Sequence, residues 1–286
     1  MWGVRRRLKV VRNPQTSGCL LSLITRTNVP TSRFRYESEM IAPLRSAIPR
    51  LTFGHRPESN VHVFSEVPAV HGVPDLTAIR FDWEAVSARQ SANVRPLSTD
   101  TEVRAVIALA DSLLTQADLA RAINVTPEYL RRAVVPLLVE RGWLTLNSAG
   151  LVFRTSESRW VARRVVTVEA KLRDWHRALG QARRQQLSSD AAFIALETKS
   201  AQNIQEDLSR IAAGGIGVLA VDPTTQRVKV LIRPRDFSKK RSFAGRMLIA
   251  ERCLEMWGRG VTEGQIYPVF GWNNLTQSGE NRFPSR

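Results

Sequence analysis

Short apolar runs alternate with helical segments through the second half of the chain, and this alternation limits the possible folds more than any other feature. Runs rich in β-branched residues predict strands at 164–170, 191–196, 216–221 and 227–232. The segments at about 174–187 and 202–212 have helical periodicity. Because strands and helices in alternation build a sheet with helices packed against it, we expect an α/β fold.

The first half of the chain adds a helix and two strands to this sheet. Apolar residues recur at i, i+4 and i+8 and predict an amphipathic helix over 36–52, with Met40, Leu44 and Ile48 on its buried side. Two short strands are predicted at 60–67 and 75–83, on either side of a turn rich in proline. The polar, aperiodic segment 84–98 predicts a linker.

Over residues 99–156 the sequence pattern becomes mainly helical. Thr115 predicts one helix N-cap, and Thr126 predicts another with Pro127 at the first helical position. Gly142 ends the last helix, and two short strand-like pieces follow at 143–146 and 151–154. Three helices and a β-hairpin predict a winged helix, carried with its linker as an insertion over 84–158.

The 286 residues carry a net charge of +16, and the positive charge gathers at the two ends of the sequence. Residues 1–50 hold ten Lys or Arg and two acids, and residues 233–286 hold ten and five, which leaves a net of +3 for the middle. A basic surface attracts polyphosphates, so nucleic acid is the leading partner, although many basic proteins are merely soluble.

Composition also limits the class of protein and the cellular compartment in which we expect it. A hydrophobic content of 43% argues against a wholly disordered chain, and no run of 18 apolar residues offers a membrane span. Two cysteines, Cys19 and Cys253, are too few for a disulfide framework or a zinc site and suit a reducing compartment. We therefore expect a cytoplasmic, nucleoid-associated protein. Residues 1–35 predict a poorly ordered basic arm, or alternatively an organellar transit segment, and 236–286 a basic extension with one helix near 244–257.

Two short motifs contain charged residues of the kind that form metal-binding sites. Glu169-Ala170-Lys171 ends an apolar strand, and residues two apart on a strand face the same side. Burying a glutamate and a lysine there is costly without a purpose. Asp75 opens another strand directly after Pro74. Two carboxylates with a neighbouring lysine form a hard oxygen site suited to Mg²⁺, for which Mn²⁺ can substitute.

In the order of these elements the chain resembles the PD-(D/E)xK nuclease superfamily, which has a restriction-endonuclease-like fold. The elements are a helix, a strand, Pro74-Asp75, the strand with Glu169-x-Lys171, and a helix bearing Gln181. The resemblance covers a core of 36–83 and 159–235 and implies a mixed central sheet flanked by helices. Asp75 and Glu169 are 94 positions apart, farther than the family usually has them, and the insertion accounts for the difference.

The resemblance also implies residue roles. Asp75 and Glu169 would hold the metal, with the Ala170 carbonyl as a further ligand, and Lys171 would position the attacking water. Gln181 would steady the site or the substrate. An additional carboxylate would come from Glu39, with Glu37 as the weaker choice in the same helix, or from Glu66, and these stay open.

Two surfaces are candidates for DNA contact. In the winged helix, the start of helix 127–140 would enter the major groove with the wing beside it, through Tyr129, Arg131, Arg132 and Arg154. Glu128 argues against phosphate binding there, and winged helices often serve protein–protein contacts instead. In the helix after the E-x-K strand, one face carries Arg177, Gln181, Arg184 and Gln185.

The sequence thus predicts a Mg²⁺-dependent DNA endonuclease that a winged helix positions on double-stranded DNA, in restriction, defence or repair. The main alternative is a non-enzymatic DNA-binding regulator on a nuclease-like scaffold, and a basic RNA-binding protein is a weaker third option. A cutter of palindromic sites would require a homodimer.

Overall fold

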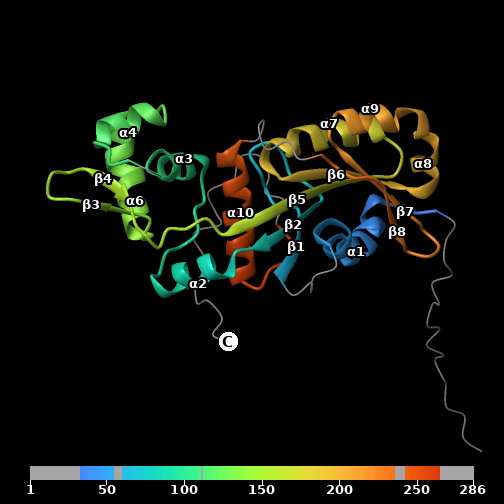
Figure 1. Ribbon diagram of the computed structural model, residues 1–286, viewed down its shortest axis with the longest axis horizontal. Coiled ribbons are helices and arrows are strands. Elements are labelled where there is room, and N and C mark those ends of the chain that lie inside the picture. The colour runs from blue at the N-terminus through green and yellow to red at the C-terminus, as the bar shows by residue number, and fades with distance from the viewer. Residues whose placement is uncertain (1–32, 55–59, 111, 236–241, 265–286) are drawn as a thin grey trace, which may run out of the picture.

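A six-stranded mixed sheet forms the centre of the computed structural model, which describes residues 33–54, 60–110, 112–235 and 242–264 (Figure 1). The strand order is β1-β2-β5-β6-β7-β8. The strands are β1 (Val61–Ser65), β2 (Leu76–Phe81), β5 (Ala162–Lys171), β6 (Ala191–Glu197), β7 (Gly217–Val221) and β8 (Val228–Ile232). The three central strands β5, β6 and β7 are parallel, and the other neighbours are antiparallel. The predicted α/β class, a mixed sheet flanked by helices, is confirmed.

Helices cover both faces of the sheet because its central strands are apolar on both sides. One face packs against α1 (Ile41–Phe53), which follows the 3₁₀ turn η1 (Glu37–Met40). The other face packs against α7 (Trp175–Gln185), α8 (Thr198–Asn203), α9 (Leu208–Ala213) and α10 (Phe243–Gly258). Along β5 the alternation is visible in single residues: Val166 and Val168 join the α1 core, whereas Val165 joins the α10 core.

Residues 99–156, which we call the insert, form three helices and a hairpin between the neighbouring strands β2 and β5. The first two helices are α3 (Asp100–Ala108) and α4 (Gln116–Ala122). Helix 127–140 runs through α5 (Pro127–Tyr129), the π-helical η3 (Leu130–Val134) and α6 (Val135–Glu140), and the hairpin is β3 (Leu144–Leu146) with β4 (Val152–Arg154). Thr115 and Thr126 are N-caps, as predicted, because their side chains accept backbone hydrogen bonds from Asp118 and Tyr129.

Three expectations about the organisation were wrong. Part of the expected linker 84–98 is a helix, α2 (Trp83–Ser91), capped by the Asp82 side chain. The helix expected near 244–257 is present as α10, but it does not belong to an extension, because its buried residues pack on the sheet and on α3. Phe34, assigned to the N-terminal arm, is buried in the α1 core. Within the two expected basic ends, residues 1–32, 236–241 and 265–286 lie outside the described part of the chain.

Candidate active site

The antiparallel pairing of β2 with β5 sets Asp75 opposite Glu169. Leu76 pairs with Val168, so the residue before one and the residue after the other meet at the same end of the two strands. The backbone N–H of Ala170 donates to Asp75 Oδ2 at 2.6 Å, which fixes the aspartate against the end of β5. Strand pairing thus brings together two residues that are 94 positions apart in sequence. The chain leaves β2 for the insert and returns into β5 at the opposite end of these two strands.

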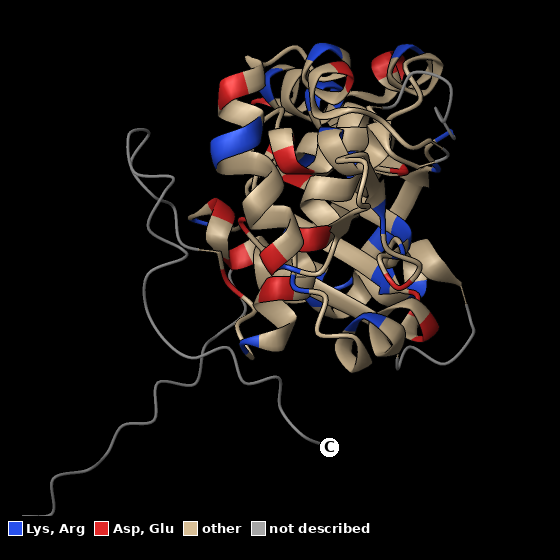
Figure 2. Ribbon diagram, turned by 90° about the vertical axis from the view of Figure 1, so that its left-hand side faces the viewer, with Lys and Arg blue, Asp and Glu red and all other residues tan. Residues whose placement is uncertain are grey.

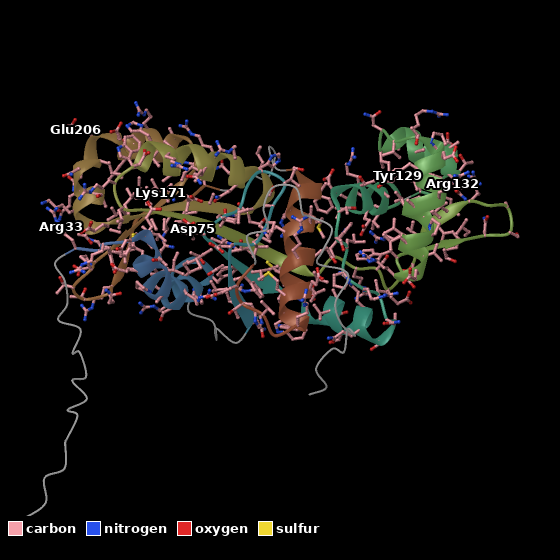
Figure 3. The ribbon with its side chains drawn as sticks, turned by 180° about the vertical axis from the view of Figure 1, so that it is seen from behind. Arg33, Asp75, Tyr129, Arg132, Lys171 and Glu206 are labelled. Carbon is pink, nitrogen blue, oxygen red and sulfur yellow. The ribbon has the colours of Figure 1, made fainter. Side chains whose placement is uncertain are left out.

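Lys171 ties three carboxylates together. Its Nζ lies 3.2 Å from Glu169 Oε1, 3.0 Å from Glu37 Oε2 and 4.0 Å from Asp75 Oδ2. It also donates to the Ala170 carbonyl at 2.9 Å. The side chains of Glu169 and Lys171 are only 1% and 12% exposed, so these charges interact with little screening by water. Asp75 and Lys171 lie beside each other in Figure 3, far from the end that carries Tyr129 and Arg132.

Crowding of negative charge perturbs the titration of these groups. Burial raises the pKa of Asp75, and the nearby Glu37 raises it further against the opposing effects of the Ala170 N–H and Lys171. Burial and then the Asp75 charge raise the pKa of Glu169. Burial alone would lower the pKa of Lys171, but its three carboxylate neighbours outweigh that effect and the pKa is raised. The lysine therefore stays protonated at neutral pH.

This donor set fits Mg²⁺. Two carboxylates with raised pKa values face each other, and a divalent cation would relieve their repulsion. The ligands are hard oxygens, and Mg²⁺ commonly takes one or two carboxylates and fills its shell with water and phosphate oxygens. Among the described residues, Asp75 Oδ1 receives no hydrogen bond, and no group of three or more His, Cys, Asp or Glu is arranged as metal ligands.

The glutamine that reaches the site is Gln185, and not Gln181 as the sequence predicted. Gln185 Nε2 donates to Glu169 Oε2 at 2.7 Å, and both side chains are buried. Gln181 lies one turn earlier, and its buried Oε1 accepts no hydrogen bond from the residues that the structure describes. The small residues Ala178 and Ala182 face the sheet, and Gln185 continues their row at i+7, which is the signal that would have identified it.

The first-helix carboxylate beside Lys171 is Glu37, and not Glu39, the expected choice. Glu39 instead accepts the backbone N–H of Arg35 at 2.8 Å. Glu66 lies close to Asp75, since its N–H donates to the Asp75 carbonyl at 3.2 Å. Burial raises the pKa of Glu66, and the charges of Asp75 and Glu263 add to the effect. Glu66 is therefore a neighbour of the cluster without a hydrogen bond or ion pair to Lys171 in the described structure.

The predicted DNA-contact residues fall into two sets. Arg177 and Arg184 are exposed on α7, on the helix that carries Gln185 to the site. Tyr129, Arg131, Arg132 and Arg154 lie in the insert. Arg131 and Arg132 both reach Glu128, at 4.0 and 2.7 Å, and Arg154 lies 5.6 Å from the ring centre of Trp160.

Comparison with known proteins assigns no family to the chain: no protein-family model matches it, and no curated protein matches its sequence. Among the described residues, none of the helices has the combination of length and apolar character needed to cross a membrane.

Proposed function

We propose that the chain is a Mg²⁺-dependent endonuclease that hydrolyses phosphodiester bonds in DNA. The observation that carries the proposal is the meeting of Asp75, Glu169 and Lys171 at the paired ends of β2 and β5, although 94 residues separate the two acids in sequence. Burying the charges of Glu169 and Lys171 costs folding free energy, so their presence next to the buried Val168 favours a functional role.

Each side chain has a distinct part in this proposal. Asp75 and Glu169, with the Ala170 carbonyl, would hold the metal ion, which when bound supplies Lewis-acid stabilisation of charge on the phosphate oxygens. Lys171, protonated because its pKa is raised, orients the attacking water and stabilises the negative charge that develops on the phosphate. Gln185 holds Glu169 in place through its 2.7 Å hydrogen bond. Hydrolysis is direct, without a covalent enzyme intermediate.

The surface of α7 is the best candidate to hold the DNA backbone. Four exposed arginines lie on or next to this helix and form no ion pair with other described residues: Arg173, Arg177, Arg183 and Arg184. The same helix places Gln185 against Glu169, so a phosphate backbone bound along α7 passes the site. Unpaired arginines release counterions when they bind phosphates, which favours nucleic acid over a neutral ligand.

Cleavage of supercoiled plasmid with Mg²⁺ or Mn²⁺ tests the proposal. We expect nicking by the wild type and its loss in Asp75→Ala and in Lys171→Ala. Glu37→Ala and Glu39→Ala form a matched pair in one turn: the first should reduce the rate, because Glu37 contacts Lys171, and the second should not. Metal-dependent cleavage that survives Lys171→Ala would refute the mechanism.

A non-enzymatic DNA-binding regulator is the second candidate. The observation that favours it is that Lys171 alone ties all three carboxylates into a closed network of ion pairs, which is also how a structural cluster is built. In that case the wild type binds duplex DNA without cutting it, and Lys171→Ala leaves the binding unchanged.

A further inference from the structure

An apolar row runs along the outer side of helix 127–140, where a DNA-reading helix would be polar. Tyr129 and Val139 are 49% and 40% exposed, and Ala133 and Pro136 between them are exposed as well. These residues follow one another at intervals of four, three and three. Pro136 has no N–H to donate, and the helix widens before it, with the Val135 N–H bonded to the Leu130 carbonyl.

The insert also lacks the surplus of positive charge that DNA binding requires. Residues 99–156 contain six arginines and six acids, so the net charge is zero in a chain of +16. Its arginines pair within the insert at 2.7 to 2.9 Å in Arg104–Asp100, Arg121–Asp118, Arg132–Glu128 and Arg141–Glu102. Figure 2, viewed from this end of the molecule, shows acidic and basic positions interspersed. A neutral surface with an apolar row fits a protein partner better than a polyphosphate.

We propose that helix 127–140 is the contact surface for a second copy of this chain, paired about a twofold axis. An antiparallel pair of these helices that crosses at Pro136 sets Ala133 opposite the second copy's Val139. The same register sets Arg132 opposite the second copy's Glu140. Since a twofold axis repeats each contact, the pair gains two apolar contacts and two ion pairs at once.

The charge distribution favours helix 127–140 over the rest of the molecule as the place where two copies pair. Two chains of +16 repel each other, and the repulsion is smallest where the local net charge is zero. The Glu140 side chain is 64% exposed and lies 2.9 Å from Arg95 of its own chain, which leaves most of the carboxylate open to a second partner. Asp75 and Lys171 lie far from Tyr129 and Arg132 in Figure 3, and α10 lies between the insert and α7 in Figure 1, so pairing through helix 127–140 leaves the site and α7 uncovered.

A charge-swap experiment tests the proposal by sedimentation equilibrium over a concentration series. One helix pair is a small interface, so we expect the wild type to pass from 32.1 kDa to twice that mass in the micromolar range. Arg132→Glu and Glu140→Arg should each stay monomeric, because each places like charges opposite each other. An equimolar mixture of the two variants should form a heterodimer, since both contacts are then of opposite sign.

Two further variants keep the result independent of folding and of catalysis. Pro136→Lys removes a proline from a helix interior, which favours the fold, yet it places two lysines at the twofold axis and should abolish pairing. Lys171→Ala should pair like the wild type, so failure of the nuclease proposal and failure of this one are distinguishable. A wild type that stays monomeric at every concentration would overturn the inference, and so would Arg132→Glu, Glu140→Arg or Pro136→Lys variants that pair like the wild type. So would a monomer whose affinity for duplex DNA falls on Arg131→Ala/Arg132→Ala, since helix 127–140 would then be a DNA-binding surface.

Discussion

A buried ion pair joins α2 to α10 beside the core of the insert, and its removal gives the sharpest test of how the molecule is held together. Arg89 of α2 and Glu251 of α10 are 1% and 0% exposed and form two hydrogen bonds of 2.7 and 2.8 Å. The Leu97 N–H donates to the same carboxylate at 3.1 Å. The Arg89 guanidinium lies 4.4 Å from the ring centre of Trp143, which belongs to the core of the insert.

The substitution Glu251→Leu leaves the Arg89 guanidinium buried without a counter-charge. Removing one partner of a buried pair costs about 3–5 kcal/mol. Domains of this kind have unfolding free energies of about 5–15 kcal/mol, so the loss takes a large part of the total. Equilibrium unfolding in urea, monitored by far-UV circular dichroism, should show a lower midpoint with a similar slope.

The double variant Arg89→Met/Glu251→Leu separates the charge effect from packing. With both charges gone, the remaining cost is the unpaired Leu97 N–H, about 1–3 kcal/mol. The exposed pair Arg159–Glu84, at 3.0 Å, is the matched control, and Glu84→Gln should change stability by no more than about 0.5 kcal/mol. If the double variant is no more stable than Glu251→Leu, or if Glu251→Leu costs less than about 1 kcal/mol, the reasoning is refuted.

Three further predictions concern the site. In metal-free protein, Glu169→Gln should raise the melting temperature at neutral pH. Because the pKa of Glu169 is raised, the folded state binds the proton of this carboxyl more tightly than the unfolded chain does. The stability of the wild type therefore falls as the pH rises from the ordinary carboxyl pKa through the raised one. The variant should lose this pH dependence. Gln185→Leu removes a hydrogen bond that lowers the pKa of Glu169, so the acidic limb of the pH–rate profile should move to higher pH, whereas Gln181→Leu should leave it in place. Arg183→Ala/Arg184→Ala should weaken duplex binding in fluorescence anisotropy and reduce the salt slope by about 2, and an unchanged slope would exclude α7 as the backbone contact.

Local signals in the sequence were sufficient for most elements. Thr115 and Thr126 are followed by helices that they cap, and the apolar runs became strands because their residues lie buried on both faces. The helix α2 escaped the same reasoning because its buried residues include an arginine, Arg89, which a hydrophobic pattern does not register. That arginine is tolerated only because Glu251, 162 residues away, supplies the charge.

The motifs at Asp75 and Glu169–Lys171 were recognisable in the sequence. Residue types are read from it directly, and the strand positions follow from the neighbouring residues along the chain. Which acid and which glutamine complete the cluster depended on how η1 and α7 dock against the sheet. Glu37 and Glu39 of the 3₁₀ turn η1 point in different directions, because successive residues of such a turn are rotated by about 120°. Gln181 and Gln185 share one face of α7 one turn apart, so the position of α7 along the sheet decides which of them reaches the site. Sequence alone thus determined the strands, the caps and the chemical types in the site. Only the tertiary structure decided which side chains meet, because each of those contacts joins segments whose relative position no local propensity specifies.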